Sequence, residues 1–200
     1  AGRFIYDDLM NDYRYVGGAI DNPNVMDKEA ASMALRAFLA LYDADESKQW
    51  MQAAVQTAYF YQTWVVSKDI PIPTDDSTVA AIDAFSFYRV YLLMGDKQML
   101  HMSKLLQRNT KQFMNWDLEN DPLKWIGEGL LGEAMNISIT RGRGVNYYLP
   151  WSTYNQLEPL VLFEDVFGHK DIESIEDLSL EEKNEKHRSY SLSRMYEKIK

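Results

Sequence analysis

The chain has 200 residues, 46% of them hydrophobic and 26% charged, which is the balance of a folded globular domain rather than a disordered chain. Its net charge of −9 argues against a nucleic-acid partner, because no basic surface would displace the counterions of phosphate. The sequence has no Cys, which excludes disulfides, thiolate metal sites and a cysteine nucleophile. No apolar run approaches the roughly 18 residues of a membrane span.

The first predicted helix covers 28–42, where the sequence is apolar on nearly every side. A helix that is apolar all round is buried all round. The next helix covers 50–64 and differs, because its apolar residues recur at spacings of three and four and so occupy one face. The pattern therefore predicts an inner helix followed by an outer helix with one side in water.

An internal repeat extends this pair. Segment 38–64 aligns without gaps on segment 87–113 at an offset of 49 residues. The second copy again has an all-apolar helix, 78–94, followed by a helix with a single apolar stripe. The two predicted stripes are Trp50, Ala53, Thr57, Tyr61 and Trp64 in the first copy, and Met99, Met102, Leu106, Thr110 and Phe113 in the second.

The pattern after Trp116 is less regular. A turn-rich connection leads to a short inner helix at about 126–138, which is weakened by glycines. A glycine-rich loop follows, and a further helix is predicted from about Ser152 to Phe167, where Gly168 would end it. Residues 171–200 include 14 charged side chains and predict a terminal surface helix.

Alternating inner and outer helices at about 50 residues per pair predict an all-α fold, namely an α/α-hairpin toroid or a partial (α/α)6 barrel of about four hairpins. Tetratricopeptide repeats, at about 34 residues, are too short to match. Six hairpins would need roughly 300 residues at this period. We therefore expect 1–200 to be a single domain that is either an incomplete toroid or the C-terminal part of a larger one.

Candidate catalytic acids lie where the inner helices begin, because those ends of a toroid face its central funnel. Asp75 and Asp76 precede the second inner helix, where they would either cap it or form a catalytic carboxylate pair. Asp83 lies inside that apolar helix, and a buried carboxylate there requires a partner. That partner would be Arg36 or Arg89 if the role of Asp83 is structural, whereas a functional acid would face the funnel.

Further candidates lie at the other inner-helix starts. Asp27 and Glu29 open the first inner helix, a position that acids also occupy for electrostatic reasons alone. Glu128 lies among glycines that would let a ligand approach closely. The glycine-rich loop and the helix start after it contain guanidinium and aromatic groups, which suit sugar binding. A well-packed loop without a ligand would contain the same types of residue. These candidate residues are Arg141, Arg143, Tyr148, Trp151 and Tyr154.

The three histidines have no metal-ligand spacing, and the sequence contains no phosphate-binding loop, dinucleotide fingerprint or serine nucleophile elbow. We therefore expect neither a metal site nor a cofactor.

Three motifs in the chain resemble those of large secreted bacterial proteins of the six-hairpin glycosidase-like superfamily. They are the DKEA helix start, the turns LYDADESKQW and VYLLMGDKQML, and the loop RGRGVNYYLPW. The resemblance covers about residues 20–168 and implies the C-terminal part of an (α/α) toroid that processes carbohydrate. It supplies no catalytic pair, and the hairpins that would complete the ring are missing.

These observations together predict a carbohydrate-active protein with glycoside-hydrolase-like acid and base chemistry. Asp75 or Asp76 would act with Glu128 as the catalytic pair. Asp83, Asp27 and Glu29 are the further candidates if that pair is not catalytic. One alternative is a non-catalytic glycan-binding or structural helical-repeat module, and another is a polysaccharide lyase.

The expected partners are a carbohydrate and a missing N-terminal part of the same chain. The expected location is secreted or periplasmic. The N-terminus carries no secretory signal pattern, as in either a mature secreted chain or an excised fragment.

Overall fold

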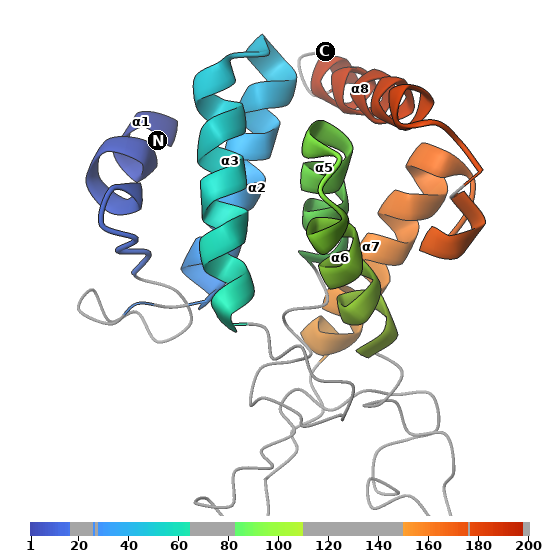
Figure 1. Ribbon diagram of the computed structural model, residues 1–200, viewed down its shortest axis with the longest axis horizontal. Coiled ribbons are helices and arrows are strands. Elements are labelled where there is room, and N and C mark those ends of the chain that lie inside the picture. Colours follow the sequence, from blue (N-terminus) through green and yellow to red (C-terminus); the bar gives the residue numbers. More distant parts are fainter. Residues whose placement is uncertain (17–25, 27, 65–82, 110–149, 176, 198–200) are drawn as a thin grey trace, which may run out of the picture.

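The computed structural model describes residues 1–16, 26, 28–64, 83–109, 150–175 and 177–197 (Figure 1). Within these ranges the chain is helical and forms no strand, which confirms the all-α prediction. The longer helices are α2 (Lys28–Asp45), α3 (Lys48–Tyr61), α5 (Ala84–Met94), α6 (Lys97–Asn109), α7 (Pro150–Phe167) and α8 (Leu180–Glu197). The shorter elements are α1 (Gly2–Phe4), the π-helical segment η1 (Ile5–Met10), and the 3-10 helices η2 (Gln62–Trp64) and η5 (Ile172–Ile175).

The predicted repeat is present as two helical hairpins, α2–α3 and α5–α6. The first helix ends at Asp45 in one copy and at Met94 in the other, and the second begins at Lys48 and Lys97. Both pairs of boundaries are separated by the 49 residues of the sequence offset. The hairpin therefore is the unit that repeats between these two segments of the described chain.

The two tight turns share a left-handed residue at the same position of the repeat. Gly95 has φ of 69°, which glycine adopts without a steric penalty. Its counterpart Glu46 has φ of 56°, where the Cβ atom crowds the following carbonyl group. The backbone shape of the turn is thus conserved between the copies although only one copy has the residue best suited to it.

Helix α5 is the centre of the fold. Every residue from Ala84 to Leu92 is buried, because α5 contacts α2, α3, α6, α7 and α8. This confirms the prediction of an inner helix. Helix α2 is less enclosed than predicted, since Met33, Ala40 and Ala44 are exposed on it.

The apolar stripes of the outer helices are largely confirmed. Met99, Met102 and Leu106 are buried along α6, while the last two residues of that predicted stripe lie outside the described part of the chain. On α3 the stripe is buried at its centre, but its last residue, Trp64 of η2, is 39% exposed. The end of this stripe is therefore more exposed to solvent than the sequence pattern indicated.

The N-terminal segment lies outside the repeat and packs on the first hairpin. Tyr6 makes edge contacts with Phe38 and Trp50, which stack on each other with ring centroids 6.0 Å apart. Further along, the hydroxyl groups of buried Tyr15 and Thr57 lie 2.7 Å apart in a hydrogen bond. These contacts attach the segment to α2 and α3.

The predicted C-terminal helices are confirmed. Gly168 ends α7 with φ of 79°, as expected for a left-handed helix stop. Helix α8 opens with a capping box, in which Glu182 accepts a hydrogen bond from the backbone N–H of Ser179 at 2.8 Å and Ser179 Oγ accepts one from the N–H of Glu182 at 3.2 Å.

The helices share a polarity that matters for function. Helices α2, α5 and α7 begin, and α3 and α6 end, at the lower end of the molecule in Figure 1. The tight turns and α8 lie at the opposite end. The starts of the inner helices, where the candidate acids were expected, therefore face the same way.

Candidate functional site

Most of the predicted site residues lie outside the described part of the chain. Trp151 belongs to the first turn of α7, but its side chain is not described. Glu29 is half-buried in the first turn of α2, and Tyr154 is 58% exposed on α7. The candidates outside the described residues are Asp27, Asp75, Asp76, Glu128, Arg141, Arg143 and Tyr148.

Asp83 is the candidate acid that the structure describes in full. It precedes Ala84 at the start of α5 and is 0% exposed, yet its side chain makes no capping hydrogen bond to that helix. The hydroxyl group of Tyr61, on α3, donates a 2.7 Å hydrogen bond to Asp83 Oδ2. Oδ1 of Asp83 and the Ser32 hydroxyl group are both buried without a hydrogen-bond partner among the described residues.

Neither of the two arginines suggested as partners of Asp83 forms an ion pair with it. Arg36 forms its ion pair with Glu158 at 2.8 Å, and Arg89 forms its own with Asp43 at 2.9 Å. Both arginines thus connect other helices, α2 to α7 and α5 to α2. Their choice of partner depends on which helices pack together, and a single helix pattern does not contain that information.

The pKa of Asp83 is raised above its ordinary value of 3.8, mainly because burial disfavours the charged carboxylate. The hydroxyl groups of Ser32 and Tyr61, and then the charges of Arg36 and Lys28, lower this pKa but do not offset burial. Ser32 lies close enough to act on the carboxyl group without a hydrogen bond of normal geometry. Asp83 therefore holds its proton to higher pH than an exposed aspartate.

A protonated carboxylic acid can donate a hydrogen bond or a proton, which is what a general acid requires. Asp83 has that protonation tendency and lies at the end where the inner helices begin. It is fully enclosed in this structure, so it does not itself line an open site. Its described environment is equally that of a structural acid, held by Tyr61.

A second buried polar cluster, which the sequence analysis missed, joins α2, α5 and α8. Asp43 accepts hydrogen bonds from Arg89 Nη2 at 2.9 Å and from the Ser191 hydroxyl group at 2.9 Å. Arg89 Nη1 donates to Asn184 Oδ1 at 2.6 Å. His187 Nδ1 lies 3.8 Å from Asp43 Oδ2, too far for a hydrogen bond.

The repeat itself contained a signal for this cluster. At the offset of 49 residues, Asp43 occupies the position of Leu92, and Arg89 occupies the position of Ala40. A charged residue in one copy where the other copy is apolar indicates a special contact. The cluster uses both of these positions.

His187 of the same cluster is buried and neutral. Burial, and then the nearby positive charge of Arg89, lower its pKa well below the ordinary 6.5. Its ring stacks on Phe85 with centroids 5.5 Å apart. The cluster therefore holds one ion pair, Asp43 with Arg89, beside an uncharged imidazole.

Comparisons of the chain with protein-family models, with curated proteins and with solved structures found no match. Among the described residues, no group of three or more His, Asp or Glu side chains could hold a metal ion. No helix in the described part has the length and apolarity required to cross a membrane.

Proposed function

We propose that this chain is part of a carbohydrate-active α/α-hairpin toroid with glycoside-hydrolase-like activity, secreted or periplasmic in its native setting. The observation that carries the proposal is the common polarity of the hairpins. Helices α2, α5 and α7 begin at one end of the array, and the buried acid Asp83, whose pKa is raised, lies at that end (Figure 1). In a toroid, that end would face the substrate funnel.

The proposed chemistry needs one carboxylic acid to protonate the glycosidic oxygen and one carboxylate to activate water or attack the anomeric carbon. Asp75 or Asp76, with Glu128, are the proposed pair. Asp83, Asp27 and Glu29 are the reserve acids. The proposed sugar-binding groups, which offer aromatic faces and guanidinium donors, are Arg141, Arg143, Tyr148, Trp151 and Tyr154.

The test is the release of reducing sugar from a panel of neutral and acidic polysaccharides by the purified protein. We expect Asp75→Asn with Asp76→Asn, or Glu128→Gln, to lower the rate by at least about a hundredfold, the usual effect of losing an acid or base. Glu173→Gln, at an exposed carboxylate on η5, is the matched control and should leave the rate unchanged. Equal rates in all variants would rule out these acids.

A non-catalytic glycan-binding or structural module is the second candidate, and the burial of Asp83 favours it. This acid is 0% exposed and hydrogen-bonded to Tyr61, as a structural carboxyl group would be. A binding module predicts saturable glycan binding with no product, in the wild type and in the carboxamide variants alike. Unsaturated products would instead indicate a lyase.

A further inference from the structure

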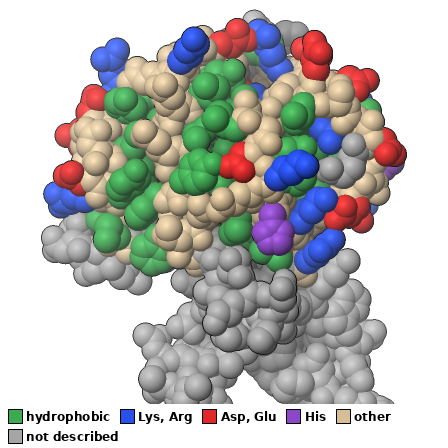
Figure 2. Space-filling model, in the orientation of Figure 1, with side chains coloured by type: hydrophobic (Ala, Val, Ile, Leu, Met, Phe, Trp, Pro, Cys, Tyr) green, Lys and Arg blue, Asp and Glu red, His purple; other side chains and the backbone are tan. Residues whose placement is uncertain are grey.

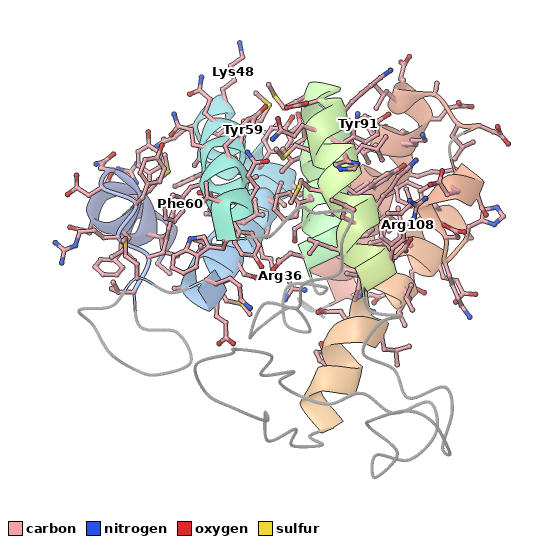
Figure 3. The ribbon with its side chains drawn as sticks, turned by 60° about the horizontal axis from the view of Figure 1, so that its bottom comes forward. Arg36, Lys48, Tyr59, Phe60, Tyr91 and Arg108 are labelled. Carbon is pink, nitrogen blue, oxygen red and sulfur yellow. The ribbon has the colours of Figure 1, made fainter. Side chains whose placement is uncertain are left out.

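A pocket of about 190 Å³ lies between helices α2, α5, α7 and α8, beside the cluster of Asp43, Arg89 and His187. It is open to the surface along α2, where Ala40 is exposed. Figure 3 shows Arg36, one of its lining residues, on α2. The polar side chains that line it include Arg36, Arg89, His187 and Ser191.

The polar end of the pocket has buried groups whose hydrogen bonds are incomplete. Arg89 is 4% exposed, and its Nη1 and Nη2 atoms donate to Asn184 and Asp43. Its Nε atom has no partner among the described residues, and neither has Nδ1 of His187, which is 5% exposed. Buried polar atoms left unpaired in this way destabilise the fold unless a ligand or water completes their hydrogen bonds.

The charge of the lining favours an anion. Arg36 and Arg89 both line the pocket, whereas Asp43 is the single carboxylate among its lining residues. His187 is neutral and adds no charge. The ion-pair partner of Arg36, Glu158, is not part of the lining. The side chain of Arg36 is 27% exposed, so it lies between the interior of the pocket and the surface.

The remaining wall of the pocket is apolar. It is formed by Leu39 and Ala40 of α2, Phe85 of α5 and Leu162 of α7. A ligand that fits therefore combines an anionic head with a short hydrocarbon part. A carboxylate fits such a site, because its two oxygen atoms match the planar fork of N–H donors of an arginine guanidinium group.

We infer that this pocket binds a small aliphatic carboxylate, with its head at Arg89 and Arg36 and its hydrocarbon part against Leu39 and Leu162. The volume suits a ligand of roughly six heavy atoms, at about 30 Å³ for each water-sized group. Butanoate has this size.

The test is titration of the whole protein with butanoate, followed by NMR shifts of His187 and by calorimetry. Saturable binding is expected, with butanamide at least about tenfold weaker, because the charge-assisted hydrogen bonds are lost. Arg36→Gln should weaken butanoate binding by a similar factor. Arg108→Gln, at an exposed ion pair with Glu173, is the control and should not.

A second pair of variants leaves the ion pairs intact. Ala40→Leu fills the open side of the pocket and should abolish butanoate binding, whereas Ala44→Leu, one turn further along the exposed side of α2, should not. Equal binding of butanamide, unchanged affinity in Ala40→Leu, or no saturation up to about 50 mM would overturn the inference and leave the pocket to water.

Discussion

At the scale of single residues, Asp83 illustrates how burial can outweigh hydrogen bonds and charges in setting the pKa of a side chain. Its neighbours Tyr61, Ser32, Arg36 and Lys28 all favour the ionised carboxylate, yet desolvation outweighs them and raises the pKa. Such a carboxyl group binds its proton more tightly in the folded chain than in the unfolded chain. Its ionisation therefore opposes folding.

The ionisation of Asp83 makes the free energy of unfolding depend on pH. Between the unfolded pKa of 3.8 and the raised folded pKa, the native state binds more protons, so the free energy of unfolding falls as pH rises. Asp83→Asn, which cannot ionise and can still accept the Tyr61 hydrogen bond, should remove this fall. Urea unfolding of both proteins from about pH 4 to pH 8 measures the difference. A variant much less stable than the wild type at pH 7 would contradict the prediction.

At the scale of elements, the two hairpin turns have the same left-handed backbone conformation with different residues. Position 46 and position 95 are equivalent in the repeat and both are left-handed, but one is Glu and the other Gly. Near Gly95, the closest atom to an added Cβ would be Leu180 Cδ1 at 3.8 Å, so space does not forbid a side chain there. The cost of a substitution would be conformational.

Gly95→Ala should therefore lower the free energy of unfolding by about 1–2 kcal/mol, the penalty of a Cβ atom in the left-handed region. The reverse change in the other copy, Glu46→Gly, should not lower it, and should raise it by up to about 1 kcal/mol. Chemical denaturation of the two variants beside the wild type gives both values. Two changes of the same sign would show that local contacts, such as the ion pair of Glu46 with Arg188, outweigh the backbone.

Helix α8 is attached to the hairpins through polar contacts. Asn184 of this helix accepts a hydrogen bond from Arg89 of α5, and Ser191 donates one to Asp43 of α2. His187 is buried against α5, where its ring stacks on Phe85. The packing of α8 depends on pH, because protonation of His187 places a second positive charge beside Arg89. The docking of α8 is thus linked to the protonation of one side chain.

The folded pKa of His187 lies well below its unfolded value of 6.5. The contribution of the neutral histidine to the free energy of unfolding is therefore fully present above pH 6.5 and is lost as the pH falls toward the folded pKa. The loss should be about 1.4 kcal/mol for each pH unit until the folded pKa is reached. His187→Phe should flatten this dependence, whereas His169→Gln, at an exposed histidine, should not. Amide hydrogen exchange along α8 from about pH 7 to pH 5 measures it, and equal slopes in all three proteins would refute it.

At the scale of the whole molecule, α5 joins every large element of the described fold. It contacts both helices of the first hairpin, its own partner α6, and the C-terminal helices α7 and α8. Figure 2 shows apolar side chains gathered over α3 on one face, while charged side chains gather over α6 and the C-terminal elements. The interior around α5 therefore provides the common core that these surfaces enclose.

A cavity in this core should destabilise the molecule as a unit. Phe87 is 0% exposed and stacks on Tyr61 with centroids 5.5 Å apart, so Phe87→Ala should cost about 3–5 kcal/mol. Phe4→Ala, at a ring 59% exposed on the N-terminal segment, is the matched control and should cost less than about 0.5 kcal/mol. Thermal unfolding followed by circular dichroism compares them. A loss confined to one hairpin would contradict a single cooperative core.

The sequence by itself determined the order of the longer helices in the described part of the chain. Its apolar spacing and its 49-residue repeat predicted both hairpins, their turns, the helix stop at Gly168 and the terminal helix, because these features depend on neighbours within a few residues. The burial of α5 also followed from its composition. The greater exposure of α2 did not, since exposure depends on how many other helices pack around it.

Only the tertiary structure decided which side chains meet. The sequence predicted that Asp83 needs a partner and indicated Arg36 or Arg89. In the structure, Asp83 accepts a hydrogen bond from Tyr61, and Arg89 forms its ion pair with Asp43. These partners are separated by 22 and 46 residues along the chain. No local period encodes such distances, because they are set by how whole helices lie against one another.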